Sequence, residues 1–299
     1  MKRILVTGAQ GFTGVHLLER LAREGHELHG LAHQATPDPH PLLRNEYAAD
    51  LRDFASLGRV IEQVEPHLVV HLAAIAFVAH GDAAELYSSN ILGTRNLLQA
   101  LAVAKRPPEA VLLASSANVY GNRREGVLDE SLTPEPANDY GITKLACEML
   151  GRLYADRLPI ITVRPFNYTG RGQGEQFIIP KIIAHAKARQ PVIELGNIDV
   201  ARDFSDVRTV VDTYARLLAE PRAVGGLYNV CSGEARPLSD VIDLVEQLSG
   251  HHMEVTVNPA FVRADEVKFL CGSRARLESV IGPVAMPPLQ ETLRWMLDD

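Results

Sequence analysis

The sequence is poor in cysteine and contains no long apolar or basic run. Its three cysteines, Cys147, Cys231 and Cys271, are odd in number and widely spaced, which argues against a disulfide framework and a zinc cluster. No apolar run approaches the ~18 residues that span a bilayer, and residues 1–8 reach a glycine too early for a signal peptide. A net charge of -7 without a Lys/Arg run argues against nucleic acid or an anionic membrane as the main partner. We therefore expect a cytoplasmic protein.

The composition is that of a globular protein, with 46% hydrophobic and 22% charged residues among 299. The first half alternates short β-rich runs with amphipathic helical patterns, of which 15–24 and 90–104 are the clearest. This alternation predicts an α/β fold, a doubly wound parallel sheet with helices on both faces. The predicted strands are 4–6, 27–31, 68–72, 110–114 and 160–164.

The second half is more irregular than the first. A glycine-rich loop at 170–174 is followed by predicted helices at 178–188 and 203–219. We therefore expect a dinucleotide-binding domain at 1–166 and a smaller α/β substrate lobe at 167–299, in which about 203–232 packs back on the first domain. The active site should lie between the two.

A glycine-rich turn follows the first predicted strand. Gly8 would allow a tight turn, Gly11 a close approach of the backbone to phosphates, and Gly14 close packing of the following helix on the strand. The N-terminus of that helix would face the anion. A turn that binds nothing is the alternative, since a glycine trio alone is a weak signal.

The end of the second predicted strand bears on the choice of cofactor. An NAD-preferring site usually places an acid there, whereas residues 30–34 contain none and include His33. His33 could hydrogen-bond a 2′-phosphate, so the sequence favours NADP(H), with NAD(H) as the other option. A surface histidine without a role is the alternative.

Three side chains form a candidate catalytic group. Tyr140 and Lys144 lie four residues apart on one predicted helix face, and a nearby ammonium group lowers the pKa of a phenol. Ser116 follows the predicted strand 110–114, at the sheet edge where ligands bind. Ser116 would hold a substrate oxygen while Tyr140 exchanges a proton with it.

These motifs occur together in the order TGAxGFxG at 7–14, Asp50-Leu51-Arg52-Asp53, His71-Leu72-Ala73-Ala74, Asn90 in NxxGTxNLL, the serines and YxxxK. The chain resembles an extended short-chain dehydrogenase/reductase over essentially its whole length. The resemblance implies catalysis by Ser116, Tyr140 and Lys144. It implies a cofactor site made of Gly8, Gly11, Phe12, Thr13, Gly14, His33, Asp50, Leu51, Leu72, Ala73, Ala74, Ser115, Tyr140 and Lys144.

The second half is similar to the GDP-sugar branch of that family, and most similar to the GDP-4-keto-6-deoxy-D-mannose reductases, which make GDP-D-rhamnose. The segments that carry this likeness are 164–173, 196–204 and 228–233. The resemblance implies substrate contacts from Asn167, Lys181, Arg202, Arg263 and Glu266. Taken singly, Lys181 and Arg202 would more often be solvated surface residues.

One position separates reduction from dehydration within that branch. By resemblance, the dehydratases carry a glutamate where this chain has Asn118, and an amide cannot exchange a proton as a carboxylate does. We therefore expect reduction of the 4-keto group of a nucleotide-activated 6-deoxyhexose. A 4-epimerase that retains NAD, a GDP-mannose 4,6-dehydratase and a scaffold that keeps only the fold are the alternatives.

The resemblance also implies a homodimer that packs residues 90–104 and 140–157 into a four-helix bundle. His251 and His252 are adjacent, so their side chains point apart, and we assign no metal.

Overall fold

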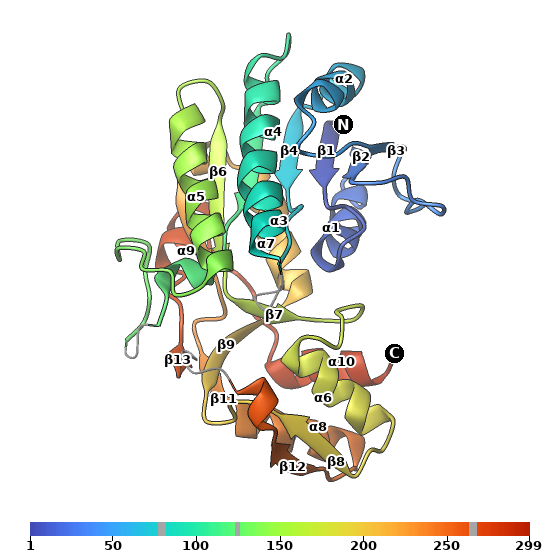
Figure 1. Cartoon of the computed structure of the whole chain (residues 1–299), viewed down its shortest axis with the longest axis vertical. Coiled ribbons are helices and arrows are strands. Elements are labelled where there is room, and N and C mark those ends of the chain that lie inside the picture. Colours follow the sequence, from blue (N-terminus) through green and yellow to red (C-terminus); the bar gives the residue numbers. More distant parts are fainter. Residues whose placement is uncertain (77–81, 123–125, 263–267) are drawn as a thin grey trace.

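A seven-stranded parallel sheet forms the larger part of the molecule, in the order β10-β6-β5-β4-β1-β2-β3 (Figure 1). The computed structural model describes residues 1–76, 82–122, 126–262 and 268–299. The order reverses between β1 and β4, and ligands bind at such a switch point. The predicted doubly wound sheet is confirmed. Its strands are β1 (Arg3–Thr7), β2 (Glu27–Ala32), β3 (Asn45–Ala48), β4 (Leu68–His71), β5 (Ala110–Ala114), β6 (Ile160–Pro165) and β10 (Leu227–Val230).

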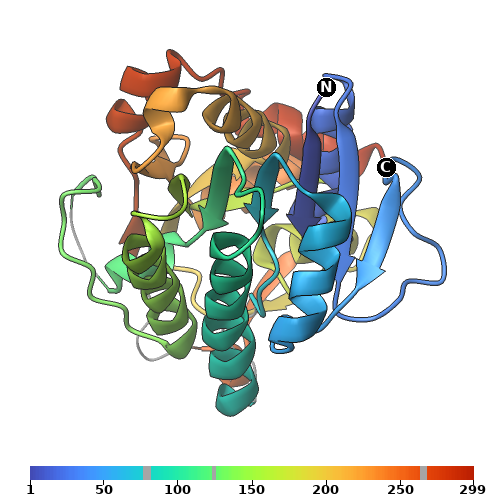
Figure 2. The ribbon, with the colours of Figure 1, turned by 90° about the horizontal axis from the view of Figure 1, so that it is seen from above.

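Helices cover both faces of this sheet (Figure 2). Both faces must be covered because both are apolar. In β1, Ile4 and Val6 belong to the core on one face, while Leu5 belongs to the core on the other. The first core includes α1 (Phe12–Ala22), α7 (Val207–Ala219) and α9 (Ala275–Ile281). The second includes α2 (Phe54–Val64), α4 (Gly93–Ala102) and α5 (Asp139–Tyr154).

A smaller α/β lobe lies below the carboxyl ends of the large sheet in Figure 1. One small sheet contains β7 (Asn167–Thr169), β9 (Ala201–Asp206), β11 (Ala235–Pro237) and β13 (Phe269–Leu270), and another pairs β8 (Val192–Leu195) with β12 (Glu254–Val257). Its own core is closed by α6 (Ile178–Lys187), α8 (Leu238–Ser249) and α10 (Leu289–Leu297). The short helices are α3 (Ala83–Tyr87), the π-helix η1 (Ser88–Leu92) and the 3-10 helices η2 (Ala117–Tyr120), η3 (Pro221–Ala223) and η4 (Pro259–Phe261).

The chain passes between the two parts more than once. From β9 it enters α7, which contacts α1, and then β10, which forms the outer edge of the large sheet beside β6. The domain boundary at 166 and 167 stays a prediction. In the described part of the chain, no helix has the length and apolarity needed to cross a membrane.

One predicted helix begins later than expected. Residues 203–206 of the predicted helix 203–219 belong to β9, and α7 begins only at Val207. The carboxylate of Asp206 accepts a hydrogen bond from the backbone N–H of Arg208, which makes Asp206 the N-cap. The carboxylate of Asp203, expected in a helix, instead accepts backbone hydrogen bonds from Ser232, Gly233 and Gly272.

Candidate active site

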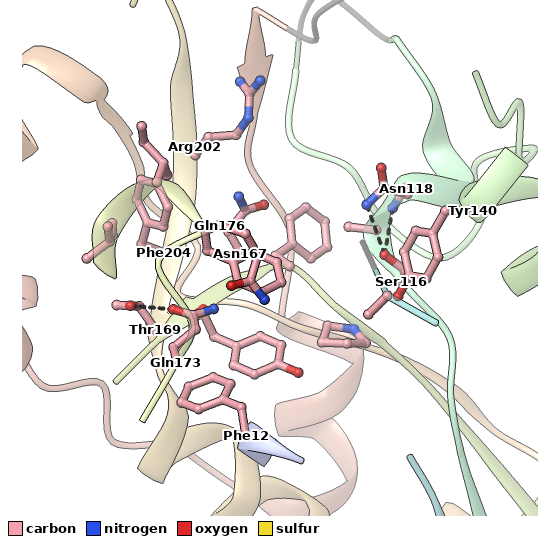
Figure 3. Close-up of a pocket in the computed structure, with 18 of the residues that line it drawn as sticks. Phe12, Ser116, Asn118, Tyr140, Asn167, Thr169, Gln173, Gln176, Arg202 and Phe204 are labelled. Carbon is pink, nitrogen blue, oxygen red and sulfur yellow. Dashed lines mark hydrogen bonds between the residues drawn. The ribbon is translucent and has the colours of Figure 1, made fainter. Parts of the chain in front are cut away.

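A cavity of about 1270 Å³ lies between the large sheet and the smaller lobe (Figure 3). Its walls come from the ends of the large sheet's strands and from β7, α6 and β9. Residues predicted from sequence that line it are Gly8, Gly11, Phe12, Thr13, Gly14, Leu72, Ala74, Ser115, Ser116, Tyr140, Lys144, Asn167, Lys181 and Arg202. His33, Asp50, Leu51 and Ala73 lie outside its lining. Arg263 and Glu266 lie outside the described residues.

The glycine turn brings three backbone segments close together. Gly8 has φ +72°, and a Cβ there would lie 2.9 Å from the backbone nitrogen of Ala73. A Cβ on Gly14 would lie 2.3 Å from the carbonyl oxygen of Gly8, so α1 packs directly on the turn. Gly11 gives α1 no side-chain cap, and its first turn has no acidic residue. This end of α1 therefore suits an anion such as a dinucleotide pyrophosphate.

Buried hydrogen bonds hold the strand ends beneath this turn. Thr7 Oγ1 accepts from the backbone N–H of Ala73 at 3.1 Å and lies 2.7 Å from His71 Nδ1. His71 Nε2 lies 2.9 Å from Thr94 Oγ1 on α4. Burial lowers the pKa of His71 to about 3, and the charge of Lys144 acts in the same direction. His71 is therefore neutral at physiological pH and joins β1, β4 and α4.

Tyr140 and Lys144 lie in the first two turns of α5, and Ser116 is the second residue after β5. Lys144 Nζ donates to the carbonyl oxygen of Ala114 at 2.8 Å and lies 5.8 Å from the centre of the Tyr140 ring. Burial raises the pKa of Tyr140 to about 12, which the Ser116 hydroxyl partly opposes, and burial lowers the pKa of Lys144. The expectation that the pKa of Tyr140 is lowered is not met, because burial is the largest effect on this phenol and raises its pKa. Tyr140 thus carries a proton at neutral pH and can act as an acid.

The hydroxyl of Ser115 hydrogen-bonds to a carboxylate outside the candidate catalytic group. Ser115 Oγ donates to Glu148 Oε1 at 2.6 Å. Arg164 donates to both oxygens of Glu148, at 2.8 and 2.7 Å, and the two side chains are 1% and 2% exposed. This buried ion pair joins α5 to β6 behind the cavity. Arg164 is the first residue of the segment 164–173, and no partner was predicted for it.

The region predicted for the cofactor's adenosine contains a carboxylate that the second strand does not reveal. Asp50, from the loop after β3, places Oδ2 3.8 Å from His33 Nδ1. Residues 30–34 themselves carry no carboxylate, and Asp50, which the family resemblance placed at the cofactor, comes close to His33 because β3 pairs with β2. Hydrogen bonds from Arg52, the nearest at 2.6 Å, hold the pKa of Asp50 below its usual value. The Asp50 charge is thus paired with a cation.

The wall of the cavity that the smaller lobe forms contains cations and amides. Lys181 Nζ donates to the carbonyl oxygen of Glu194 at 2.7 Å and lies 4.6 Å from the centre of the Phe261 ring. Arg202 is 9% exposed and donates to the carbonyl oxygen of Ala201 at 3.0 Å. Side chains that were not predicted as site residues also line the cavity, among them Asn138, Tyr168, Gln173, Gln176, His185 and Phe204. Of these, Asn138 carried a usable signal, since an asparagine directly before a helix is a typical N-cap.

Comparison with known proteins decides the family. Residues 4–231 match the model of the NAD dependent epimerase/dehydratase family. This chain belongs to that family. The chain is 36% identical over 309 residues to GDP-6-deoxy-D-mannose reductase of Pseudomonas aeruginosa, covering 100% of this chain and 97% of the relative. It is 34% identical over 280 residues to GDP-6-deoxy-D-talose 4-dehydrogenase of Aggregatibacter actinomycetemcomitans, covering 94% and 91%.

Two solved structures of this epimerase/dehydratase fold superpose over nearly the full chain. A chain from Burkholderia cenocepacia J2315 has a TM-score of 0.93 and 46% identity, covering 99% of this chain and 97% of its own. RMD from Pseudomonas aeruginosa, solved in complex with NADPH, has a TM-score of 0.85 and 33% identity, covering 100% and 98%. The agreement in fold extends through the smaller lobe.

Proposed function

We propose that this enzyme reduces the 4-keto group of a nucleotide-activated 6-deoxyhexose with NADPH, and that GDP-4-keto-6-deoxy-D-mannose is its substrate and GDP-D-rhamnose its product. The observation that carries the proposal is one cavity lined by the glycine turn, by Ser116, Tyr140 and Lys144, and by Arg202 of the smaller lobe. Two relatives named for GDP-6-deoxysugars support the nucleotide and the sugar class. Their names differ in sugar configuration, so the product's C4 configuration is part of the test.

The catalytic roles follow from the protonation states. Nicotinamide, when bound, supplies the hydride for the carbonyl carbon. Tyr140, which burial keeps protonated, donates its proton to the carbonyl oxygen. Ser116 lies at the end of β5 and orients that oxygen, while Lys144 is held by the Ala114 carbonyl one helical turn from Tyr140. The amide of Asn118 offers no carboxylate for removing water, which favours reduction over dehydration.

The preference for NADPH rests on His33 and on the Asp50–Arg52 pair. A 2′-phosphate at this edge would meet an imidazole and a guanidinium, and the carboxylate nearby is already paired. The NADPH complex of RMD from Pseudomonas aeruginosa supports the same preference. NADH remains the alternative cofactor.

The proposal is tested by nicotinamide absorbance with purified enzyme, either cofactor, and GDP-4-keto-6-deoxy-D-mannose made in place by a separate dehydratase. We expect stoichiometric loss of reduced nicotinamide, faster with NADPH, and a single GDP-linked product whose configuration NMR identifies. Turnover of sugar without cofactor consumption would instead identify a 4-epimerase. No reaction with either cofactor would refute the proposal.

We also propose a homodimer formed through α4 and α5, which lie side by side on one face of the sheet (Figures 1 and 2). Ile142, Met149 and Leu153 of α5 share one stripe and are 40%, 47% and 68% exposed. Leu92, the last residue of η1 directly before α4, is 51% exposed. A second copy of the same two helices would cover these side chains as a four-helix bundle.

The dimer is tested by light scattering coupled to size exclusion. The natural chain should elute with twice its 32.8 kDa mass, and Leu153→Asp should elute as a monomer. Val257→Asp is the matched control, because Val257 is 50% exposed on β12 of the other lobe and should leave the dimer intact. A natural chain of monomer mass would refute this interface. A cytoplasmic location and the absence of a metal stay predictions.

A further inference from the structure

The asparagine that caps α5 has a fixed orientation. Asn138 Oδ1 accepts a hydrogen bond from the backbone N–H of Gly141 at 2.8 Å. Because a backbone N–H can only donate, the carbonyl oxygen of this amide must face the helix and its NH₂ group must face the other way. On that side, Asn138 Nδ2 donates to Asn118 Oδ1 at 3.3 Å. The helix terminus therefore fixes which end of the Asn138 amide meets Asn118.

The same reasoning applies at Asn118. Its oxygen is taken by Asn138, so its NH₂ group faces Ser116, and Asn118 Nδ2 donates to Ser116 Oγ at 3.1 Å (Figure 3). The backbone N–H of Asn118 donates to the same oxygen, also at 3.1 Å. A hydroxyl oxygen has two acceptor lone pairs and one proton. Both lone pairs of Ser116 are thus occupied, and its proton is available only for donation.

The Ser116 hydroxyl proton can point toward the cavity, beside Tyr140. Figure 3 shows the Ser116 hydroxyl beside the Tyr140 side chain, and both residues line the cavity with Asn118 and Asn138. A Cβ on Gly141 would lie 2.7 Å from the carbonyl oxygen of Asn118, so the first turn of α5 and the segment after β5 are in direct contact. The hydrogen-bond chain therefore begins at the N-terminus of α5 and ends beside Tyr140 of the same turn.

We propose that Asn138 and Asn118 are positioning residues that fix the Ser116 hydroxyl as a hydrogen-bond donor to the substrate's carbonyl oxygen. This inference rests on the proposed ketone reduction. Ser116 keeps its proton throughout, while Tyr140 transfers its own to the oxygen as hydride reaches the carbon. A donor fixed before the substrate arrives needs no reorientation as negative charge develops on that oxygen.

The variant Asn138→Asp tests the direction of these hydrogen bonds with almost no change in side-chain shape. The introduced carboxylate would still cap α5, since aspartate is as good an N-cap as asparagine, but its second oxygen would accept rather than donate. The Asn118 amide would then turn its NH₂ group toward this carboxylate and its oxygen toward Ser116. Ser116 would donate to Asn118, and the substrate would lose its donor.

We expect Asn138→Asp to lower kcat by roughly 10- to 100-fold with KM changed less than about twofold, within the range for removing one donor to a developing oxyanion. The thermal midpoint should stay at the natural value. Activity relative to the natural enzyme should recover as pH falls toward the ordinary aspartate pKa of about 3.9, because the protonated carboxyl group of the variant can donate again. Asn138→Ser is the matched control. Serine can still cap α5 and does not force the Asn118 amide to turn, so kcat should fall by less than about fivefold.

Neutron diffraction of deuterium-exchanged crystals tests the same claim without turnover. The deuteron on Ser116 Oγ should point away from Asn118 in the natural enzyme and toward Asn118 in Asn138→Asp. A deuteron directed at Asn118 in the natural enzyme would overturn the proposal, as would equal losses in the two variants without recovery at low pH. Failure of the natural enzyme to reduce the keto-sugar would refute the proposed function, and the neutron result would still decide this inference.

Discussion

Tyr140 is the residue on which the proposed chemistry depends most directly. Burial raises its pKa to about 12, so it enters the reaction protonated. We expect Tyr140→Phe to lower kcat by roughly 100-fold or more, because general-acid catalysis is lost while the ring and its packing remain. Titration of NADPH fluorescence should give an unchanged Kd. A Tyr140→Phe enzyme with natural turnover would show that another group supplies the proton.

Arg52 has a predicted role in cofactor choice. Arg52→Ala would remove the guanidinium partner of the Asp50 carboxylate at the edge where we expect the 2′-phosphate, and the two anions would repel. The KM for NADPH should rise about tenfold or more, since one charge-assisted contact is lost and a repulsion is gained, while the KM for NADH changes little. Arg59→Ala on α2, whose partner is Ser56, is the control. Equal changes for both cofactors would place the 2′-phosphate elsewhere.

Residues in contiguous motifs could be predicted, and residues that act through distant partners could not. Ser116, Tyr140 and Lys144 could be identified as candidate catalytic residues because the strand-end serine and the YxxxK spacing each lie within one short motif. The position of Asn138 as a helix cap was visible in the sequence, but its contact with Asn118 depends on how α5 meets the end of β5. Asp50 was missed as a neighbour of His33 because two adjacent parallel strands bring them together.

At the scale of elements, the ion pair between Glu148 of α5 and Arg164 of β6 fixes the helix that carries Tyr140. Glu148→Ala would leave the Arg164 charge buried without its counter-ion, which typically costs about 3 to 5 kcal/mol. Denaturant unfolding should show a loss of that size. Asp199→Asn, which removes a carboxylate that is 94% exposed in its pair with Lys268, should leave the midpoint unchanged. Equal midpoints for the two variants would contradict this account.

The strands of the large sheet were predictable where apolar runs were strong. Residues 110–114 are β5 as predicted, because a fully buried parallel strand reads as a continuous apolar run. The short strand β3 was missed because it has exposed ends and a weak apolar pattern. Residues 203–206 were assigned to a helix because their polar residues gave no strand alternation, whereas tertiary hydrogen bonds to Asp203 hold them extended.

At the scale of the whole molecule, buried His71 should make the fold sensitive to acid. Its native pKa of about 3 lies below the ordinary value of 6.5, so between these values the unfolded chain binds a proton that the native chain does not. The contribution of His71 to the free energy of unfolding is fully present above pH 6.5. It is lost as pH falls, by up to about 1.4 kcal/mol per pH unit. His71→Asn should flatten the fall in unfolding free energy between about pH 6 and pH 4. If the unfolding free energy of the variant fell just as steeply with pH, groups other than His71 would be responsible for the acid sensitivity.

We expect hydride to pass to the 4-keto carbon of a GDP-6-deoxysugar held between the two parts of the molecule. The most direct test uses NADPH deuterated at C4 of the nicotinamide, on the face that is transferred, with GDP-4-keto-6-deoxy-D-mannose. Mass spectrometry and NMR of the product should find one deuterium, bonded to C4 of the sugar. A sugar product without deuterium, or label that stays on the nicotinamide while the sugar changes, would contradict the account.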